Sequence, residues 1–245
     1  MNENNKKLLF EKEIKTEIRS IRYIFSLIIS NGILFICVLY YLNNVLGDSA
    51  GGYSSDYKLL LGMYNIMILL HYIMLLFVVP FVASNTLAKE YETNTMDLLL
   101  LTNLTTRDII DIKIKKLLIV NAIYVFSSLP LFAVAFSVGA VSLFSIVSYM
   151  VFAMCSSMCY GCVGVYVSAK TQKVTLAALT TCVIELIASL GGYIIFGYVL
   201  NFIEDLFNVK INELLWIPLG AFLQVLISFY IIKKIKQFMH QRHYK

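Results

Sequence analysis

Long apolar runs alternate with short polar segments along most of the chain. A helix rises 1.5 Å per residue, so about 20 apolar residues suffice to cross the hydrocarbon core of a bilayer. Six runs reach that length, at about 23–46, 59–84, 114–136, 142–168, 174–200 and 214–232. No period-two alternation occurs, and open strand edges are not tolerated in lipid. The pattern therefore predicts an all-α membrane protein with six transmembrane helices, as one domain over residues 1–245.

Composition and charge support this fold class and predict its orientation. The chain is 59% hydrophobic and 14% charged, whereas soluble domains are about 45–50% apolar and about 25% charged. If the helices alternate in direction, residues 1–22, 85–116, 169–173 and 233–245 share one side of the membrane. That side holds all but two of the 20 Lys and Arg residues. The positive-inside rule then predicts a multi-pass protein of the cell (plasma) membrane with both termini cytoplasmic.

Residues 1–22 are charged, but a regular apolar stripe begins in them. Apolar side chains recur every three or four positions, at Phe10, Ile14, Ile18, Ile21 and Phe25, and the basic residues lie off this stripe. Such a segment predicts an amphipathic interfacial helix on the inner membrane surface, where its basic residues meet anionic head groups. The alternative is a solvated helix that continues directly into the first span.

Two of the six runs have features of their own. The fourth is rich in small residues and is predicted to pack closely against other helices. The fifth extends over thirty residues, from Val174 to Ile203, and contains Gly191-Gly192. We expect the double glycine to break this helix, so that residues 192–213 form an outer re-entrant segment between spans 5 and 6. A single tilted, unbroken helix is the alternative.

The cytoplasmic loop at residues 85–113 contains a short leucine-rich segment. Asn94 or Thr95 can cap a helix over residues 96–101, and Thr105 starts a second helix with Asp108 as its capping-box acid. A leucine-rich helix of two turns must bury its apolar face. It either lies in the inner leaflet interface or fits a groove on a partner protein. Both alternatives stay open on physical grounds.

The stretch PFVASNTLAKEYETNTMDLLLLTNLTTRDIIDIKIKKLL resembles the cytoplasmic loop of ABC-2-type (type V exporter) permeases. The shared features are a proline late in span 2, an acidic and threonine-containing elbow, a leucine-rich helix, a polar turn and a lysine at the start of span 3. In this sequence they are Pro80, then Glu90, Glu92 and Thr95, then residues 96–101, residues 102–106 and Lys113. A second similarity is VYVSAKTQKVTLAAL, where a small-residue span ends before a short basic loop.

This resemblance implies an ABC transporter permease domain with a defined set of partners. Two permease copies, as a homodimer or a related heterodimer, form the translocation pathway, and a separate ABC ATPase subunit binds ATP and Mg. The loop helix acts as a coupling helix on that ATPase. The residues implied to contact the ATPase are Glu90, Tyr91, Glu92, Thr95, Asp97, Leu98 and Leu101. The implied activity is export of amphipathic peptides or other lipophilic compounds, with membrane lipids around the protein and no nucleic acid.

The sequence predicts no enzymatic activity for this chain. It contains no G-x-x-x-x-G-K-[ST] phosphate loop, so ATP hydrolysis would need the partner chain, and no cofactor is expected here. An intramembrane enzyme is a weaker alternative, because the spans contain neither paired carboxylates nor an H-E-x-x-H helix, and no catalytic residue is predicted. An ATP-independent membrane channel or immunity protein is the other alternative.

A few residues inside the spans carry candidate chemistry. Glu185 and His71 are titratable, and a charge at the bilayer centre costs at least about 2.5–3.5 kcal/mol. Glu185 could attract a cationic substrate, carry a proton or bind a neighbouring helix. His71 could line the substrate path or bond between helices. Three cysteines share one helix face, but we interpret them as packing thiols and predict no metal site: Cys155, Cys159 and Cys162.

Overall fold

The computed structural model describes residues 3–47, 53–96, 105–139, 141–207 and 213–243, and all its regular elements there are helices. In chain order they are α1 (Glu3–Ile18), α2 (Ile21–Gly47), α3 (Tyr53–Ser84), α4 (Ala88–Glu92), α6 (Thr106–Ser127), α7 (Leu129–Ser137), α8 (Leu143–Thr171), α9 (Val174–Phe207) and α10 (Glu213–His243). Within this part of the chain, five helical stretches are long and apolar enough to cross a membrane; they lie in α2, α3, α6 with α7, α8 and α9. The helical, multi-pass character is thus confirmed. A sixth crossing by α10 stays a prediction.

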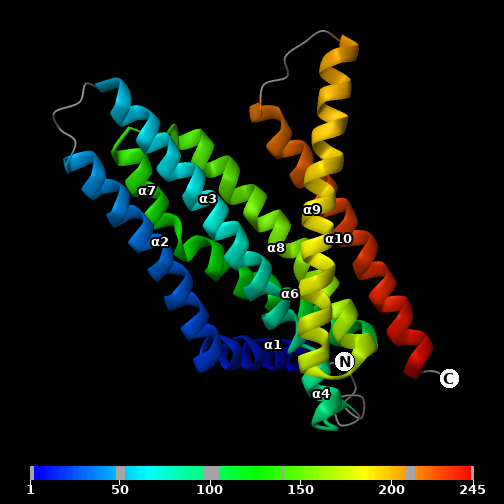
Figure 1. The fold of residues 1–245 in the computed structure, drawn as a ribbon. Helices are drawn as coiled ribbons and strands as arrows, with labels where there is room; N and C mark the ends of the chain where they lie inside the picture. Colours follow the sequence, from blue (N-terminus) through cyan, green and yellow to red (C-terminus); the bar gives the residue numbers. More distant parts are fainter. Residues whose placement is uncertain (1–2, 48–52, 97–104, 140, 208–212, 244–245) are drawn as a thin grey trace.

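The helices form a tilted bundle with charged elements gathered at one end. α2, α3, α6 with α7, and α8 run roughly side by side, and α1 lies across their lower ends (Figure 1). Both chain termini and α4 lie at this same end, which we call the basic end (Figure 1). The far ends of α9 and α10 stand away from those of α2 and α3 (Figure 1).

α8 is the central packing helix, as its small residues predicted. It contacts α3, α6, α9 and α10. A Cβ atom added at Gly164 would lie 2.5 Å from the Cβ of Ala83, and one at Gly161 would overlap the side chain of Leu117. Small residues therefore allow the backbones of α3 and α6 to approach α8 closely.

The third span is interrupted, whereas the fifth is not. α6 ends at Ser127 and α7 begins at Leu129, because the ring of Pro130 removes a backbone donor and clashes with the preceding turn. α9 continues for 34 residues through both glycines of the Gly191-Gly192 pair. Our expectation of a break there is wrong, and the unbroken-helix alternative holds. Glycine costs about 1 kcal/mol in a helix but keeps its N–H donor, so it weakens the helix without ending it.

The expected re-entrant segment is correspondingly absent from the part of 192–213 that is described. Residues 192–207 belong to α9, and α10 begins at Glu213. Residues 208–212 lie outside the described residues.

The N-terminal segment forms a helix separate from the first span. α1 ends at Ile18 and α2 starts at Ile21, so the first helix does not continue into the second. The half-buried face of α1 includes Phe10, Ile14 and Ile18, as the stripe predicted, but it also includes two glutamates. The stripe does not extend further, since Ile21 is 84% exposed. Placement of α1 at a membrane surface stays a prediction.

Candidate functional site

The loop that follows α3 is attached to α8 by one serine. Ser168 Oγ donates a hydrogen bond to the carbonyl oxygen of Ser84 at 2.9 Å and accepts one from the amide of Ala88 at 2.7 Å. It also accepts a longer bond, of 3.3 Å, from the amide of Leu87. No side chain of the loop caps α4, so a residue 80 positions later in the chain satisfies its first amides. The start of α4 is thereby attached to the end of α8.

A left-handed residue ends α4 and turns the chain back toward the bundle. Asn94 has φ 54°, a conformation that asparagine tolerates better than most residues. The amide of Asn94 bonds to the carbonyl oxygen of Tyr91 at 3.2 Å, and that of Thr95 bonds to the carbonyl oxygen of Glu90 at 2.9 Å. This is the Schellman arrangement, which satisfies the last carbonyls of a helix. It directs Met96 into the apolar core, where it is buried.

The loop also caps the next helix along the basic end. Glu92 Oε1 accepts a hydrogen bond of 2.8 Å from the backbone amide of Val174, the first residue of α9. A carboxylate at a helix N-terminus satisfies a free amide and interacts favourably with the helix dipole. The loop therefore contacts the start of α9 directly.

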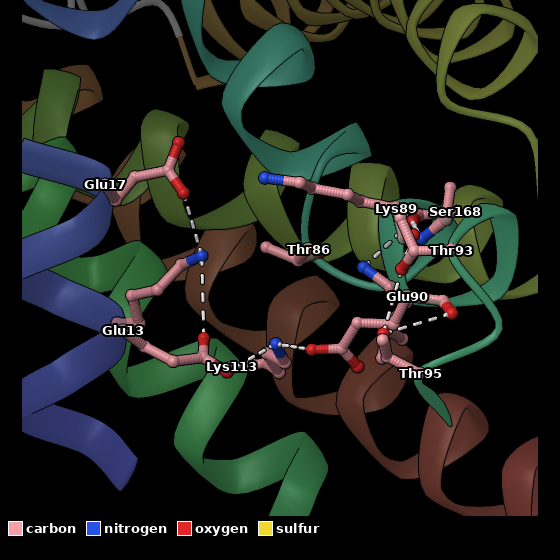
Figure 2. A network of polar contacts seen from close by, with 12 residues as sticks. Glu13, Glu17, Thr86, Lys89, Glu90, Thr93, Thr95, Lys113 and Ser168 are labelled. Atoms are coloured by element: carbon pink, nitrogen blue, oxygen red, sulfur yellow. Dashed lines mark hydrogen bonds and ion pairs between the residues drawn. The ribbon is translucent and has the colours of Figure 1, made fainter. Parts of the chain in front are cut away.

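A buried network of charges joins the loop to α1 and α6. Lys113 forms ion pairs with Glu13 at 2.5 Å and with Glu90, and Figure 2 shows its ammonium between these two carboxylates. Lys116 pairs with Glu17 at 3.0 Å and lies 3.6 Å from Glu13. Both lysine side chains are only 5% exposed. Buried charges of this kind must stay paired, because one left without its partner is costly.

Two further ion pairs extend from the same part of α6. Asp108, the acid of the capping box that begins at Thr105, pairs with Lys6 of α1 at 2.6 Å. Asp111 pairs with Lys236 of α10 at 2.6 Å. These pairs are more exposed than the lysine network and therefore contribute less to stability. The first turns of α6 thus connect α1, α4 and α10.

An apolar cluster lies beside this polar network. Leu87 and Met96 of the loop pack in one buried cluster with Ile235 and Met239 of α10, and with residues of α3, α6 and α8. The hydroxyl of Tyr91 also contacts Met239 Sδ at 3.6 Å. The described part of the loop therefore packs against the helices.

The predicted loop residues fall into three groups. In the first group Glu90, Tyr91 and Thr95 are partly buried and bonded within the chain, and in the second Glu92 is exposed. The remaining three, and with them most of the predicted leucine-rich helix, lie outside the described residues: Asp97, Leu98 and Leu101. Contact of any of these residues with an ATPase stays a prediction.

The acidic residues of α1 take part in the network although the sequence predicts no role for them. The lysines and arginines of residues 1–22 are predicted to contact lipid, whereas Glu13 and Glu17 have no predicted contact. Glu13 and Glu17 are four residues apart and therefore lie on one face of α1. They pair with Lys113 and Lys116, which are three residues apart on α6. That matching periodicity was the available signal. No feature of the sequence predicts the hydrogen bonds of Ser168, because its partners are 80 or more residues away.

His71 lies in an aromatic part of the core. It is fully buried, and its Nδ1 bonds to the hydroxyl of Tyr149 on α8 at 2.7 Å. Its ring stacks on Tyr124 of α6 at 5.8 Å between ring centroids, and Tyr124 bonds to Ser30 of α2 at 2.6 Å. His71 thus contributes to an interhelical polar contact, which was one of the two alternatives. A role in a substrate path stays a prediction.

Glu185 is the other titratable residue predicted inside the spans. Its side chain is 1% exposed, and neither carboxylate oxygen has a hydrogen-bond partner within the described residues. It lies on α9, which contacts α3 and α8. The expected hydrogen bond to a neighbouring helix is therefore missing there. As for metals, the described residues contain no group of three or more His, Cys, Asp or Glu side chains that could hold an ion.

Comparison with known proteins gives no independent assignment. No family model, no curated protein and no solved structure matches the chain.

Proposed function

We propose that this chain is the membrane-spanning subunit of an ATP-driven exporter, to which a separate ATPase binds at the loop between α3 and α6. In this proposal two copies line the pathway, and the cargo is an amphipathic peptide or another lipophilic compound. The chain contains no phosphate loop of its own, so the partner must hydrolyse the ATP.

One observation carries the proposal: the loop is bonded to nearly every helix that reaches the basic end. Glu90 pairs with α6 and, through Lys113, with α1. Ala88 bonds to α8, Glu92 caps α9 and Tyr91 contacts α10. A partner that moves this loop would therefore move the ends of these helices together. Such a connection is what coupling of ATP hydrolysis to transport requires, whereas a passive channel has no need of it.

The exposed side of the loop supports a protein partner. Lys89, Glu92, Thr93 and Asn94 are exposed, and together they form a polar tip below the apolar cluster. A polar tip of mixed charge suits a polar protein surface better than the interior of a bilayer.

The proposal is tested by purifying the tagged chain from its native membranes in mild detergent. We expect a protein with a G-x-x-x-x-G-K-[ST] motif to co-purify and the complex to hydrolyse ATP. The variant Lys89→Glu reverses one exposed charge of the tip and should lower the recovered ATPase. The same reversal on the exposed face of α1, Lys12→Glu, is the matched control and should not. Purification of the intact chain without any protein of this kind contradicts the proposal.

A further inference from the structure

A second polar region lies between α3, α8, α9 and α10, apart from the charge network. The side chain of Glu185 is close enough to interact electrostatically with Tyr72 of α3, with Cys159 and Tyr160 of α8, and with Cys182 on its own helix. The hydroxyls of Tyr72 and Tyr160 bond to each other. We call Glu185, Tyr72, Cys159 and Tyr160 the Glu185 cluster.

When it is ionised, Glu185 brings one negative charge, and no described residue supplies a balancing cation. None of its contacts among the described residues is an ion pair, and both oxygens are buried without a hydrogen bond. A buried carboxylate without a partner is unfavourable, so the site gains free energy from any group that supplies one positive charge. The absence of a second acid within the cluster makes a monovalent cation the matching ligand, and a divalent metal ion a poor one.

Aromatic rings next to this charge favour an organic cation over an inorganic one. Tyr72 stacks on Phe152 with 6.2 Å between ring centroids, and the rings of Tyr72 and Tyr160 lie 6.4 Å apart. Ring faces attract ammonium and similar cations, particularly where water is excluded. A small inorganic ion would instead need several more oxygen ligands than this cluster offers.

Glu185, Cys159 and Tyr160 are buried, and the cluster lies nearest the surface of the bundle at Tyr72. Tyr72 and Phe152 are half-buried, and so is Gln224 of α10, which bonds to Ser156 at 3.0 Å. On the same helix Phe222 is 61% exposed. A ligand whose cationic head reaches Glu185 could therefore leave an apolar body against exposed apolar side chains.

We propose that the Glu185 cluster binds the positive head of a lipophilic organic cation, with Glu185 as counter-charge and the Tyr72 and Tyr160 rings beside it. Because it takes this cation as the substrate of an exporter, the inference rests on the proposed function. The binding itself needs no ATPase, so it can be measured on the purified chain alone. A negative binding result can therefore be distinguished from a failure of the proposed coupling to an ATPase.

The test is equilibrium dialysis of tetraphenylphosphonium, whose charge does not titrate, against the full chain in nanodiscs of zwitterionic lipid. We expect saturable binding that Glu185→Gln weakens at least tenfold, which corresponds to about 1.4 kcal/mol. Glu11→Gln, the same change on the exposed face of α1, should leave the affinity unchanged. Glu185→Asp keeps the charge and should retain more binding than the glutamine variant.

Three outcomes would overturn the proposal. The first is no saturable binding by the wild-type chain, and the second is equal affinity in the wild-type and Glu185→Gln chains. The third is displacement of the probe by sodium ions at equal concentration, which would assign the site to an inorganic cation. A native circular dichroism spectrum of the Glu185→Gln chain guards against a folding artefact in that variant.

Discussion

Glu90 and Glu185 are both carboxylates enclosed by helices, but their surroundings differ. Glu90 shares the ammonium of Lys113 with Glu13, and this pairing joins α1, α4 and α6. Glu185 has no partner among the described residues. The first carboxylate is paired with a lysine of the same chain, and the second is paired with none of the described residues. A paired charge of this kind holds elements together, whereas an unpaired one is available for a ligand.

The largest expected effect comes from removing the shared cation at the basic end. Lys113→Met leaves Glu13 and Glu90 buried without their common partner and should lower the free energy of unfolding by about 3–5 kcal/mol. Denaturant unfolding in detergent micelles measures this loss. Lys115→Met is the matched control, because Lys115 is exposed, and it should change stability by less than about 0.5 kcal/mol. Equal stability of the two variants would show that the network does not hold the loop.

A smaller effect is expected at Ser168, where neutral hydrogen bonds attach the loop to α8. Ser168→Ala removes the acceptor of the Leu87 and Ala88 amides, and a buried unsatisfied donor costs about 1–3 kcal/mol. Ser157→Ala is the control, since among the described residues that buried hydroxyl bonds only to Met154 within its own helix. Faster proteolysis of the loop in the Ser168 variant alone would accompany the loss. No difference between the two variants would mean that other contacts hold α4.

The smallest effect is expected at the unpaired carboxylate. Glu185→Gln changes a carboxyl group that has no partner among the described residues, so the free energy of unfolding should stay within about 0.5 kcal/mol of wild type or rise. The same unfolding assay measures it, with Glu11→Gln as the baseline for an exposed glutamate. A clear loss of stability would reveal a partner for Glu185 and remove the contrast with Glu90.

Local signals in the sequence predicted a large part of this fold. The end of α3 at Ser84, the Thr105 and Asp108 capping box and the packing role of α8 each depend on residues near one another in the chain. The predicted break at the double glycine is wrong, because glycine weakens a helix but keeps its hydrogen bonds. Glu185 was identified because a carboxylate in an apolar run is conspicuous.

Contacts between distant parts of the chain could not be predicted in the same way. The pairs of Lys113 with Glu13 and of Ser168 with Ala88 join residues 100 and 80 positions apart. A sequence shows the spacing of residues within each helix, but it does not show which helices contact each other. The connection of the loop to the helix ends, which carries the proposed function, is of this kind.

Site-specific photocrosslinking in cells tests that function most directly. A photoreactive residue at exposed Lys89, on the loop, is compared with one at Leu69, which is 57% exposed on α3 within an apolar stretch. We predict an adduct between position 89 and a protein with an ATP-binding phosphate loop, and only lipid adducts or a second copy of the chain from position 69. Lipid adducts alone from position 89, in cells whose ATPase is present and active, would contradict the account.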